Sequence, residues 1–251
     1  MVADAYIAWG TLAVWLVMLA LYGVRVAMRG VARSERVERI GGTMLVGSGV
    51  MNATYWGIEP VVRALVAIGA TPNSLTWAAL VTGLGAGVAL GFGWYGLATL
   101  LATISTIGDI LDGQVARLTK TGSDKGELLD AAVDRYTEFA FLAGMLFAFR
   151  DSEWQMGLVL AALLASFMIS YASAKAEALQ VSPPRGLMRR HERSIYLITG
   201  AGATAMVGGA IHARWPELPV HTPEILAAAA VAVIGNYAAV VRLVRIGQAL
   251  R

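Results

Sequence analysis

The 251-residue sequence contains no cysteine and few charged residues. Without cysteine the protein has no disulfide framework, no thiolate zinc site and no cysteine nucleophile. The three histidines, His191, His212 and His221, are scattered among loops and predicted helix ends, a spacing that argues against a histidine metal site. Charged residues make up 15% of the chain and hydrophobic residues 57%, far from the usual composition of soluble proteins. The composition therefore predicts an integral membrane protein. The formal net charge is only +3, and we expect no nucleic-acid partner.

Long apolar runs predict an all-α, polytopic helical membrane protein with seven spans. A shorter amphipathic helix at residues 59–66, with Pro60 in its first turn, is expected to lie in the membrane interface. We divide the chain into an N-terminal transmembrane helix (1–30), a cytoplasmic or interfacial segment (31–71) and a membrane domain of six spans (72–251). The seven expected spans are residues 4–28, 72–92, 94–118, 126–149, 154–179, 192–211 and 223–244.

Basic residues are distributed unequally between the two sets of connecting loops. One set carries only Arg150 and Arg214, whereas five arginines follow the first span on the other side. Because Lys and Arg near span ends favour the cytoplasmic side, we expect the N-terminus outside and the acidic region described next facing the cytoplasm. The five arginines are Arg25, Arg29, Arg33, Arg36 and Arg39.

Four aspartates lie within two of the predicted spans. Asp109 and Asp112 are three residues apart, and Asp130 and Asp134 are four apart, so each pair shares one face of a helix. Ionisable residues within a membrane are costly and usually functional, and four of one sign require cations. Carboxylate oxygens suit magnesium or manganese, whose remaining ligands are commonly substrate phosphates.

Small residues accompany the aspartates on the same faces. Gly113 and Ala116 follow Asp109 and Asp112 by four residues, and Gly126 precedes Asp130 by four. A face with small side chains lets a ligand approach the backbone closely. Arg117 lies one turn after Gly113 and adds a positive charge.

The string Asp109-x2-Asp112-Gly113-x2-Ala116-Arg117-x8-Gly126-x3-Asp130-x3-Asp134 resembles the signature of the CDP-alcohol phosphatidyltransferase family at eight fixed positions. This resemblance implies transfer of a phosphatidyl group from a CDP-linked lipid, CDP-diacylglycerol, to a polar alcohol, with release of CMP. It also implies a six-helix catalytic core within residues 72–251, to which the first span is an extra N-terminal transmembrane helix. Two Mg²⁺ or Mn²⁺ ions, contact with membrane lipids and a homodimer are implied as well.

The resemblance assigns roles to these positions. Asp109, Asp112 and Asp130 would bind metal, and Asp134 would lie beside the acceptor as general base while also reaching a metal. The CDP group would contact Asp112, Gly113, Ala116, Arg117 and Gly126, together with Pro72, Asn73 and Thr76 at the start of the first core span.

Four basic residues resemble the segments of phosphatidylinositol-phosphate synthases that bind inositol phosphate: Lys175, Arg190, Arg193 and Arg242. Ser173 stands where those enzymes usually carry a basic residue. Inositol phosphate or inositol is the expected acceptor, and glycerol 3-phosphate and serine are alternatives. Ordinary positive-inside anchoring also explains basic residues at these positions.

Other readings of the aspartates remain open at this point. They could form buried ion pairs that hold helices together, although clustered like charges suit that role poorly. A membrane prenyltransferase also uses aspartate-bound magnesium, but the Gly, Ala and Arg positions between these aspartates favour the nucleotide enzyme. A divalent-cation transporter is the third alternative, because membrane carboxylates also mark ion pathways.

Overall fold

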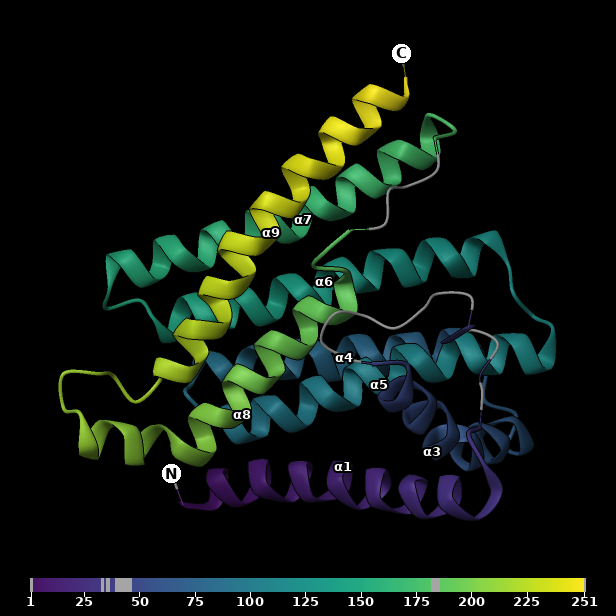
Figure 1. The fold of residues 1–251 in the computed structure, drawn as a ribbon, viewed down its shortest axis with the longest axis horizontal. Helices are drawn as coiled ribbons and strands as arrows, with labels where there is room; N and C mark the ends of the chain where they lie inside the picture. Colours follow the sequence, from purple (N-terminus) through teal and green to yellow (C-terminus); the bar gives the residue numbers. More distant parts are fainter. Residues whose placement is uncertain (1, 33, 35–36, 39–46, 182–185, 251) are drawn as a thin grey trace.

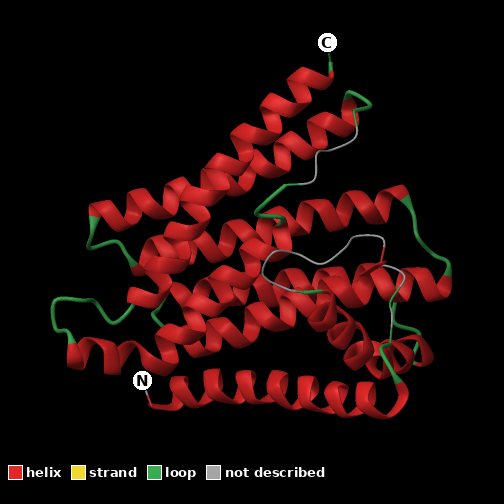
Figure 2. Ribbon diagram, viewed as in Figure 1, coloured by secondary structure: helices red, strands yellow, loops and turns green. Residues whose placement is uncertain are grey.

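The computed structural model describes residues 2–32, 34, 37–38, 47–181 and 186–250. Helices account for the regular structure of these residues, and no strand occurs among them (Figures 1 and 2). The helices are α1 (Val2–Arg29), α3 (Ser48–Ala67), α4 (Pro72–Gly91), α5 (Tyr95–Thr119), α6 (Asp124–Ala148), α7 (Glu153–Ala178), α8 (Arg190–Arg214) and α9 (Thr222–Ala249).

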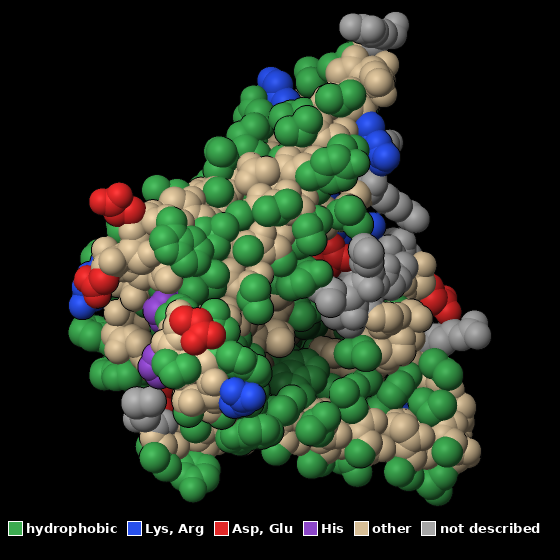
Figure 3. Space-filling model, turned by 60° about the vertical axis from the view of Figure 1, so that its left-hand side comes forward, with side chains coloured by type: hydrophobic (Ala, Val, Ile, Leu, Met, Phe, Trp, Pro, Cys, Tyr) green, Lys and Arg blue, Asp and Glu red, His purple; other side chains and the backbone are tan. Residues whose placement is uncertain are grey.

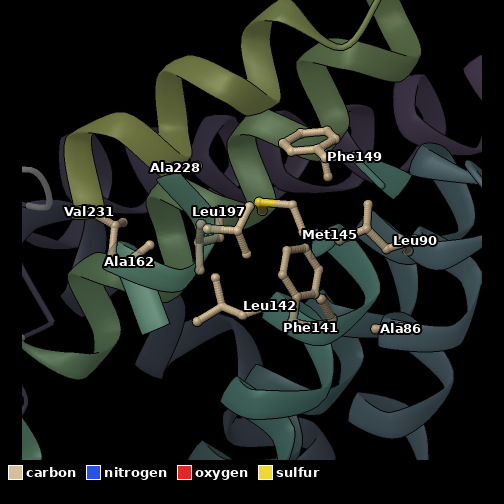
Figure 4. Close-up of a cluster of buried hydrophobic side chains, with 14 of the residues drawn as sticks. Ala86, Leu90, Phe141, Leu142, Met145, Phe149, Ala162, Leu197, Ala228 and Val231 are labelled. Carbon is tan, nitrogen blue, oxygen red and sulfur yellow. The ribbon is translucent and has the colours of Figure 1, made fainter. Parts of the chain in front are cut away.

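Helices α4 to α9 form a single bundle with a shared core. In this bundle α4 packs on α5 and α6, α7 packs on α9, and α8 connects α9 to α5. Figure 4 shows Leu142 and Met145 of α6 directed toward Leu197 of α8 and the neighbouring helices. Because these side chains are almost fully buried, they fix α6 at the centre of the bundle. The six-helix core predicted from the sequence is therefore confirmed.

The backbones of α4 and α6 touch at two glycines. A Cβ atom at Gly87 would lie 2.2 Å from the carbonyl oxygen of Ala140, and one at Gly144 would lie 2.0 Å from the carbonyl oxygen of Gly87. Only glycine permits such an approach. Two turns earlier on α4, the Ser105 hydroxyl of α5 donates to the Ala79 carbonyl over 2.7 Å. These contacts hold α5 and α6, which carry the aspartates, against one helix.

Helix α1 lies along one side of the bundle, next to α5 and α8 (Figure 1). Its Asp4 carboxylate accepts hydrogen bonds from the backbone N–H groups of Gly96 and Leu97, at 2.9 and 3.0 Å. Those N–H groups belong to the first turn of α5 and have no partner within that helix. Asp4 thus joins the start of the extra helix to the start of α5.

Helix α3 is longer than the sequence indicated. The expected helix covered residues 59–66 with Pro60 in the first turn, but α3 begins at Ser48 and Pro60 lies inside it. The earlier start is stabilised by packing, because Ile58 and Val62 are buried against Leu111 and Val115 of α5 and Tyr55 packs on the same cluster. Arg33, Arg36 and Arg39, on which the predicted orientation partly depended, lie outside the described residues.

Within the part of the chain that the structure describes, five helices, α1, α4, α7, α8 and α9, are long and apolar enough to cross a membrane. Helices α5 and α6 reach the same length, 25 residues each, but carry the acidic residues. Figure 3 shows hydrophobic side chains over most of the visible face, with few charged ones among them. The protein is therefore an integral membrane protein, as the composition predicted.

Candidate active site

The acidic cluster consists of Asp109 and Asp112 on α5 and Asp130 on α6. One carboxylate oxygen from each residue lies within 4.8 Å of the others. Asp112 is buried, and the other two are half-buried. The predicted meeting of two acidic helix faces is thus present, and its oxygen donors are close enough together to share one divalent cation.

The start of α4 lies beside this cluster. The Thr76 hydroxyl donates to a carboxylate oxygen of Asp112 over 2.7 Å, which fixes the orientation of that carboxylate. Helix α4 begins as its sequence suggests, with the Thr71 side chain accepting from the Ser74 N–H and Pro72 in the first turn.

Gly126 lies next to the same segment. A Cβ atom at Gly126 would be 3.7 Å from the amide oxygen of Asn73. The Ser123 hydroxyl accepts from the Gly126 N–H over 3.2 Å and caps α6. The residues predicted to contact CDP therefore come from three helix segments. Among the others, Gly113 and Ala116 are half-buried and Arg117 is exposed on α5.

Arg190, the first residue of α8, connects the aspartates of both helices. Its guanidinium donates to Asp109 over 3.0 Å and forms an ion pair with Asp134. The side chains of Asp109 and Asp134 are 15% and 12% exposed, so these pairs are largely shielded from water. Part of the acidic charge is therefore paired with one arginine, as in the alternative reading of the aspartates as ion pairs.

A cavity of about 710 Å³ adjoins Asp134. We call it the arginine-lined cavity. Five arginines contribute to its walls, with Ser170, Ser173 and Glu177 from α7. Arg193 has no exposed surface, and the other four keep some accessible surface, although Arg242 is largely buried. The Arg242 guanidinium donates to the Ser173 hydroxyl over 3.2 Å and to the Leu187 carbonyl over 3.1 Å. The Nε atom of Arg242 is buried and has no hydrogen-bond partner among the described residues. The four arginines with accessible surface are Arg135, Arg189, Arg190 and Arg242.

Two of the expected acceptor residues are placed differently from Arg190 and Arg242. Lys175 is exposed on α7 and does not belong to the described residues that line the cavity. Arg193 belongs to the cavity wall, but its side chain has no exposed surface. It is paired with Glu138 of α6 at 2.7 and 3.0 Å. The sequence analysis missed Glu138, although it follows Asp134 by four residues and so continues the acidic face of α6.

Comparison with known proteins agrees with the geometry of the site. The model of the CDP-alcohol phosphatidyltransferase family matches residues 69–234, which include the acidic cluster and Arg190. The chain belongs to the CDP-alcohol phosphatidyltransferase family. It is therefore a transferase, and the family predicted from the aspartate signature is confirmed.

Relatives within the family share one name. A phosphatidylinositol phosphate synthase from Corynebacterium glutamicum is 32% identical over 156 residues, which cover 59% of this chain and 70% of that protein. The enzyme of the same name from Cutibacterium acnes is 29% identical over 191 residues, or 74% of this chain and 92% of the other.

Solved structures of a phosphatidylinositol phosphate synthase from Mycobacterium tuberculosis have the same fold. The structure with CDP-DAG bound has a TM-score of 0.64 and 26% identity, covering 74% of this chain and 92% of that one. The structure in complex with manganese and citrate has a TM-score of 0.65 and covers 75% and 88%. Helix α1 lies outside the region that the family model matches.

Proposed function

We propose that this transferase moves the phosphatidyl group of CDP-diacylglycerol to a polar alcohol that carries an anionic group, with inositol phosphate as the first candidate, and releases CMP. One observation carries this proposal. The acidic cluster, suited to a divalent metal and a diphosphate, lies directly beside an arginine-lined cavity. The two sites share Asp134 and Arg190 as neighbours.

The donor set fits a hard divalent cation. Three carboxylates within 4.8 Å offer the oxygen ligands that Mg²⁺ and Mn²⁺ prefer. Asp109, Asp112 and Asp130 would hold the metal, with Asp134 completing a site for two ions. When bound, the ions would neutralise the diphosphate and stabilise the oxygens that enter and leave the attacked phosphorus.

Asp134 is the candidate general base of the reaction. It lies between the acidic cluster and the arginine-lined cavity, so its carboxylate is within reach of an acceptor hydroxyl on one side and the diphosphate on the other. Arg190 holds the carboxylates of Asp134 and Asp109 in position by pairing with both. The acceptor hydroxyl would lose its proton to Asp134 as its oxygen bonds to the phosphorus and CMP leaves.

The nucleotide would bind where α4, α5 and α6 meet. Thr76 keeps Asp112 oriented, and Asn73 and Gly126 lie together next to it. Gly113 and Ala116 leave space along α5, and Arg117 adds a positive charge for the phosphates. Pro72 begins the helix that presents these groups.

The charge of the arginine-lined cavity favours an anionic acceptor. Its volume is within the range of small-molecule sites. Arginine is suited to phosphate because its donors form paired, charge-assisted hydrogen bonds. Ser173 does not supply a positive charge, but its hydroxyl accepts from Arg242 and so orients that guanidinium. Inositol, glycerol 3-phosphate and serine are the competing acceptors.

Three further features belong to the proposal. The unequal distribution of basic residues supports an active site that faces the cytoplasm and an N-terminus outside. Residues 72–251 would form the catalytic domain, with α1 as an added span. The protein would act as a homodimer among membrane lipids.

CMP release by purified protein tests the proposal. The assay uses CDP-diacylglycerol and Mg²⁺ with inositol 1-phosphate, inositol, glycerol 3-phosphate or serine, each alone. We expect release with inositol 1-phosphate. Asp112→Asn should lower kcat at least about 100-fold, because metal coordination contributes several kcal/mol to the transition state. Asp134→Asn should stop transfer and leave CDP binding intact.

Other outcomes would replace the proposal by a named alternative. Release with glycerol 3-phosphate or serine alone would change the acceptor but keep the reaction. Transfer from a prenyl diphosphate instead would indicate a prenyltransferase. Divalent-ion uptake into vesicles without CDP binding, abolished by Asp112→Asn, would indicate a transporter.

A further inference from the structure

The acidic face of α6 extends one turn beyond the residues assigned to metal or base chemistry. Gly126, Asp130, Asp134 and Glu138 recur at four-residue intervals on this helix. Glu138 differs from the two aspartates in its partners, which are arginines from its own helix and from α8. Its role must therefore be argued from those contacts.

Glu138 is a buried carboxylate that binds two arginines. Its side chain is 6% exposed, and it accepts from Nε of Arg193 over 2.7 Å and from a terminal nitrogen of Arg193 over 3.0 Å. Arg135 donates to the same carboxylate over 3.0 Å and also to the Ser170 hydroxyl of α7. Glu138 thus joins α6 to α8 directly and to α7 through Arg135.

The donors of Arg193 are directed at the protein itself. Two of its nitrogens bind Glu138, and the third donates to the Met188 carbonyl over 2.8 Å. The side chain has no exposed surface. Arg193 therefore belongs to the wall of the arginine-lined cavity, but its donors are used by Glu138 and Met188 rather than offered to a ligand.

The Met188 carbonyl belongs to the segment that leads into α8. The adjacent Leu187 carbonyl is held by Arg242, and Met188 itself is buried with a positive φ of 57°. A non-glycine residue in this conformation requires support from its surroundings. Arg190 follows two residues later and pairs with Asp109 and Asp134. The contacts that hold Met188 in this conformation therefore also affect where the Arg190 side chain lies in the active site.

We propose that Glu138 is a positioning residue for the acceptor: it orients Arg193 and Arg135, and through the Arg193 bond to Met188 it fixes the segment that carries Arg189 and Arg190 to the arginine-lined cavity. The kinetic part of this proposal depends on the proposed function. Its structural part does not.

Loss of the Glu138 charge would leave Arg193 buried and unpaired. An uncompensated buried charge moves toward solvent or toward a new partner. Either movement of the Arg193 guanidinium would break its hydrogen bond to the Met188 carbonyl. Glu138 is connected to the acidic cluster indirectly, through the segment that carries Arg190 and its bond to Asp109, whereas Asp112 is held separately by Thr76. The nucleotide side should therefore be affected less than the acceptor side.

Steady-state kinetics of Glu138→Gln test the kinetic part. We expect the KM of the anionic acceptor to rise about tenfold or more, because charge-assisted bonds are lost, while the KM of CDP-diacylglycerol changes less than about twofold. Glu127→Gln, an exposed acidic residue in the first turn of the same helix, is the matched control and should behave as wild type. Equal changes in both KM values, or none, would overturn the proposal.

A thiol reporter tests the structural part without any activity. Since the chain has no cysteine, Met188→Cys introduces a single buried thiol. Adding Glu138→Gln should raise its labelling rate by a maleimide at least about tenfold, because local opening exposes the thiol. Adding Glu127→Gln should not. If wild-type protein releases no CMP with any acceptor, the proposed function fails and the labelling rate alone decides; an unchanged rate overturns the role of Glu138.

A double variant separates positioning from stability. Glu138→Leu with Arg193→Met removes both charges of the fully buried pair, so that only Arg135, whose side chain is 27% exposed, loses its carboxylate, and we expect most of the stability to be retained. We expect a thermal midpoint close to that of wild type together with the raised acceptor KM. Wild-type kinetics in this variant would show that the pair serves stability only.

Discussion

Arg190 illustrates how single residues determine the charge of this site. Its one positive charge is shared between Asp109 and Asp134, while the Asp112 carboxylate accepts from the Thr76 hydroxyl. Four carboxylates and one guanidinium leave a net negative site within the bilayer, which requires further cations. A divalent metal ion is suited to supply this positive charge, because its preferred ligands are carboxylate oxygens.

Arg242 and Lys175 allow a matched comparison between a basic residue that lines the cavity and one that does not. Arg242→Ala should raise the acceptor KM about tenfold or more, since charged hydrogen bonds contribute roughly 1.5–3 kcal/mol. Lys175→Ala removes an equal charge from an exposed position outside the cavity lining and should change the KM less than about twofold. Initial rates at varied acceptor concentration measure both. Similar effects in the two variants would contradict a localised anion site.

The sequence predicted which residues belong to the candidate site better than it predicted the ion pairs that they form. Helical spacing brings Asp109 to Asp112 and Asp130 to Asp134, so these faces could be predicted without a structure. The same spacing reaches Glu138, which was overlooked because the resembled signature stops at Asp134. The bond between Arg190 and Asp109 joins residues 81 positions apart, and local periodicity contains no information about it.

Among the helices, the contact of α4 with α6 sets the geometry of the site. Thr76 of α4 orients Asp112 of α5, and the position of α4 is fixed by the backbone contact at Gly87 and Gly144. A change in the distance between α4 and α6 would therefore be transmitted to the acidic cluster, although the glycines lie several turns from it.

Gly87→Ala tests this dependence. Its Cβ atom would overlap the Ala140 carbonyl, so we expect a loss of about 1–3 kcal/mol of stability, and a weaker apparent affinity for Mg²⁺. Gly91→Ala in the same helix meets only ordinary contacts at 3.6 Å or more and serves as control. Thermal unfolding in detergent, with and without Mg²⁺, measures both effects. Equal behaviour of the two variants would exclude a tight α4–α6 contact.

The apolar runs of the sequence predicted where the helices begin and end. How the helices pack against one another depends on tertiary contacts, which the runs do not contain. The expected spans agree with the observed helices to within a few residues, with the largest differences at the ends of α8 and α9. The earlier start of α3 comes from contacts of Ile58 and Val62 with α5, which a local pattern does not reveal. The same holds for the place of α1 beside α5 and α8.

At the scale of the whole molecule, the acidic cluster and the arginine-lined cavity lie toward the same end of the bundle. The connection between α5 and α6, which begins after Lys120, is also at this end, and the connection between α8 and α9 is at the other (Figure 1). The orientation of the protein therefore determines from which side of the membrane a water-soluble acceptor enters.

Single cysteines in the cysteine-free chain test this orientation. Gly122→Cys lies in the exposed connection before α6, and Glu217→Cys lies in the exposed connection before α9. In intact cells a membrane-impermeant maleimide should label Glu217→Cys at once and Gly122→Cys only after permeabilisation. The reverse pattern would place the active site outside. Labelling of both variants in detergent controls for reactivity.

The bond between Asp4 and the first turn of α5 also has a consequence for biosynthesis. The two partners are 92 residues apart, so at about 5–20 residues per second Asp4 leaves the ribosome roughly 5–20 s before Gly96. During that interval its carboxylate has none of its final donors and must remain hydrated near the membrane surface. Helix α1 can therefore insert early but can dock only once α5 has been made.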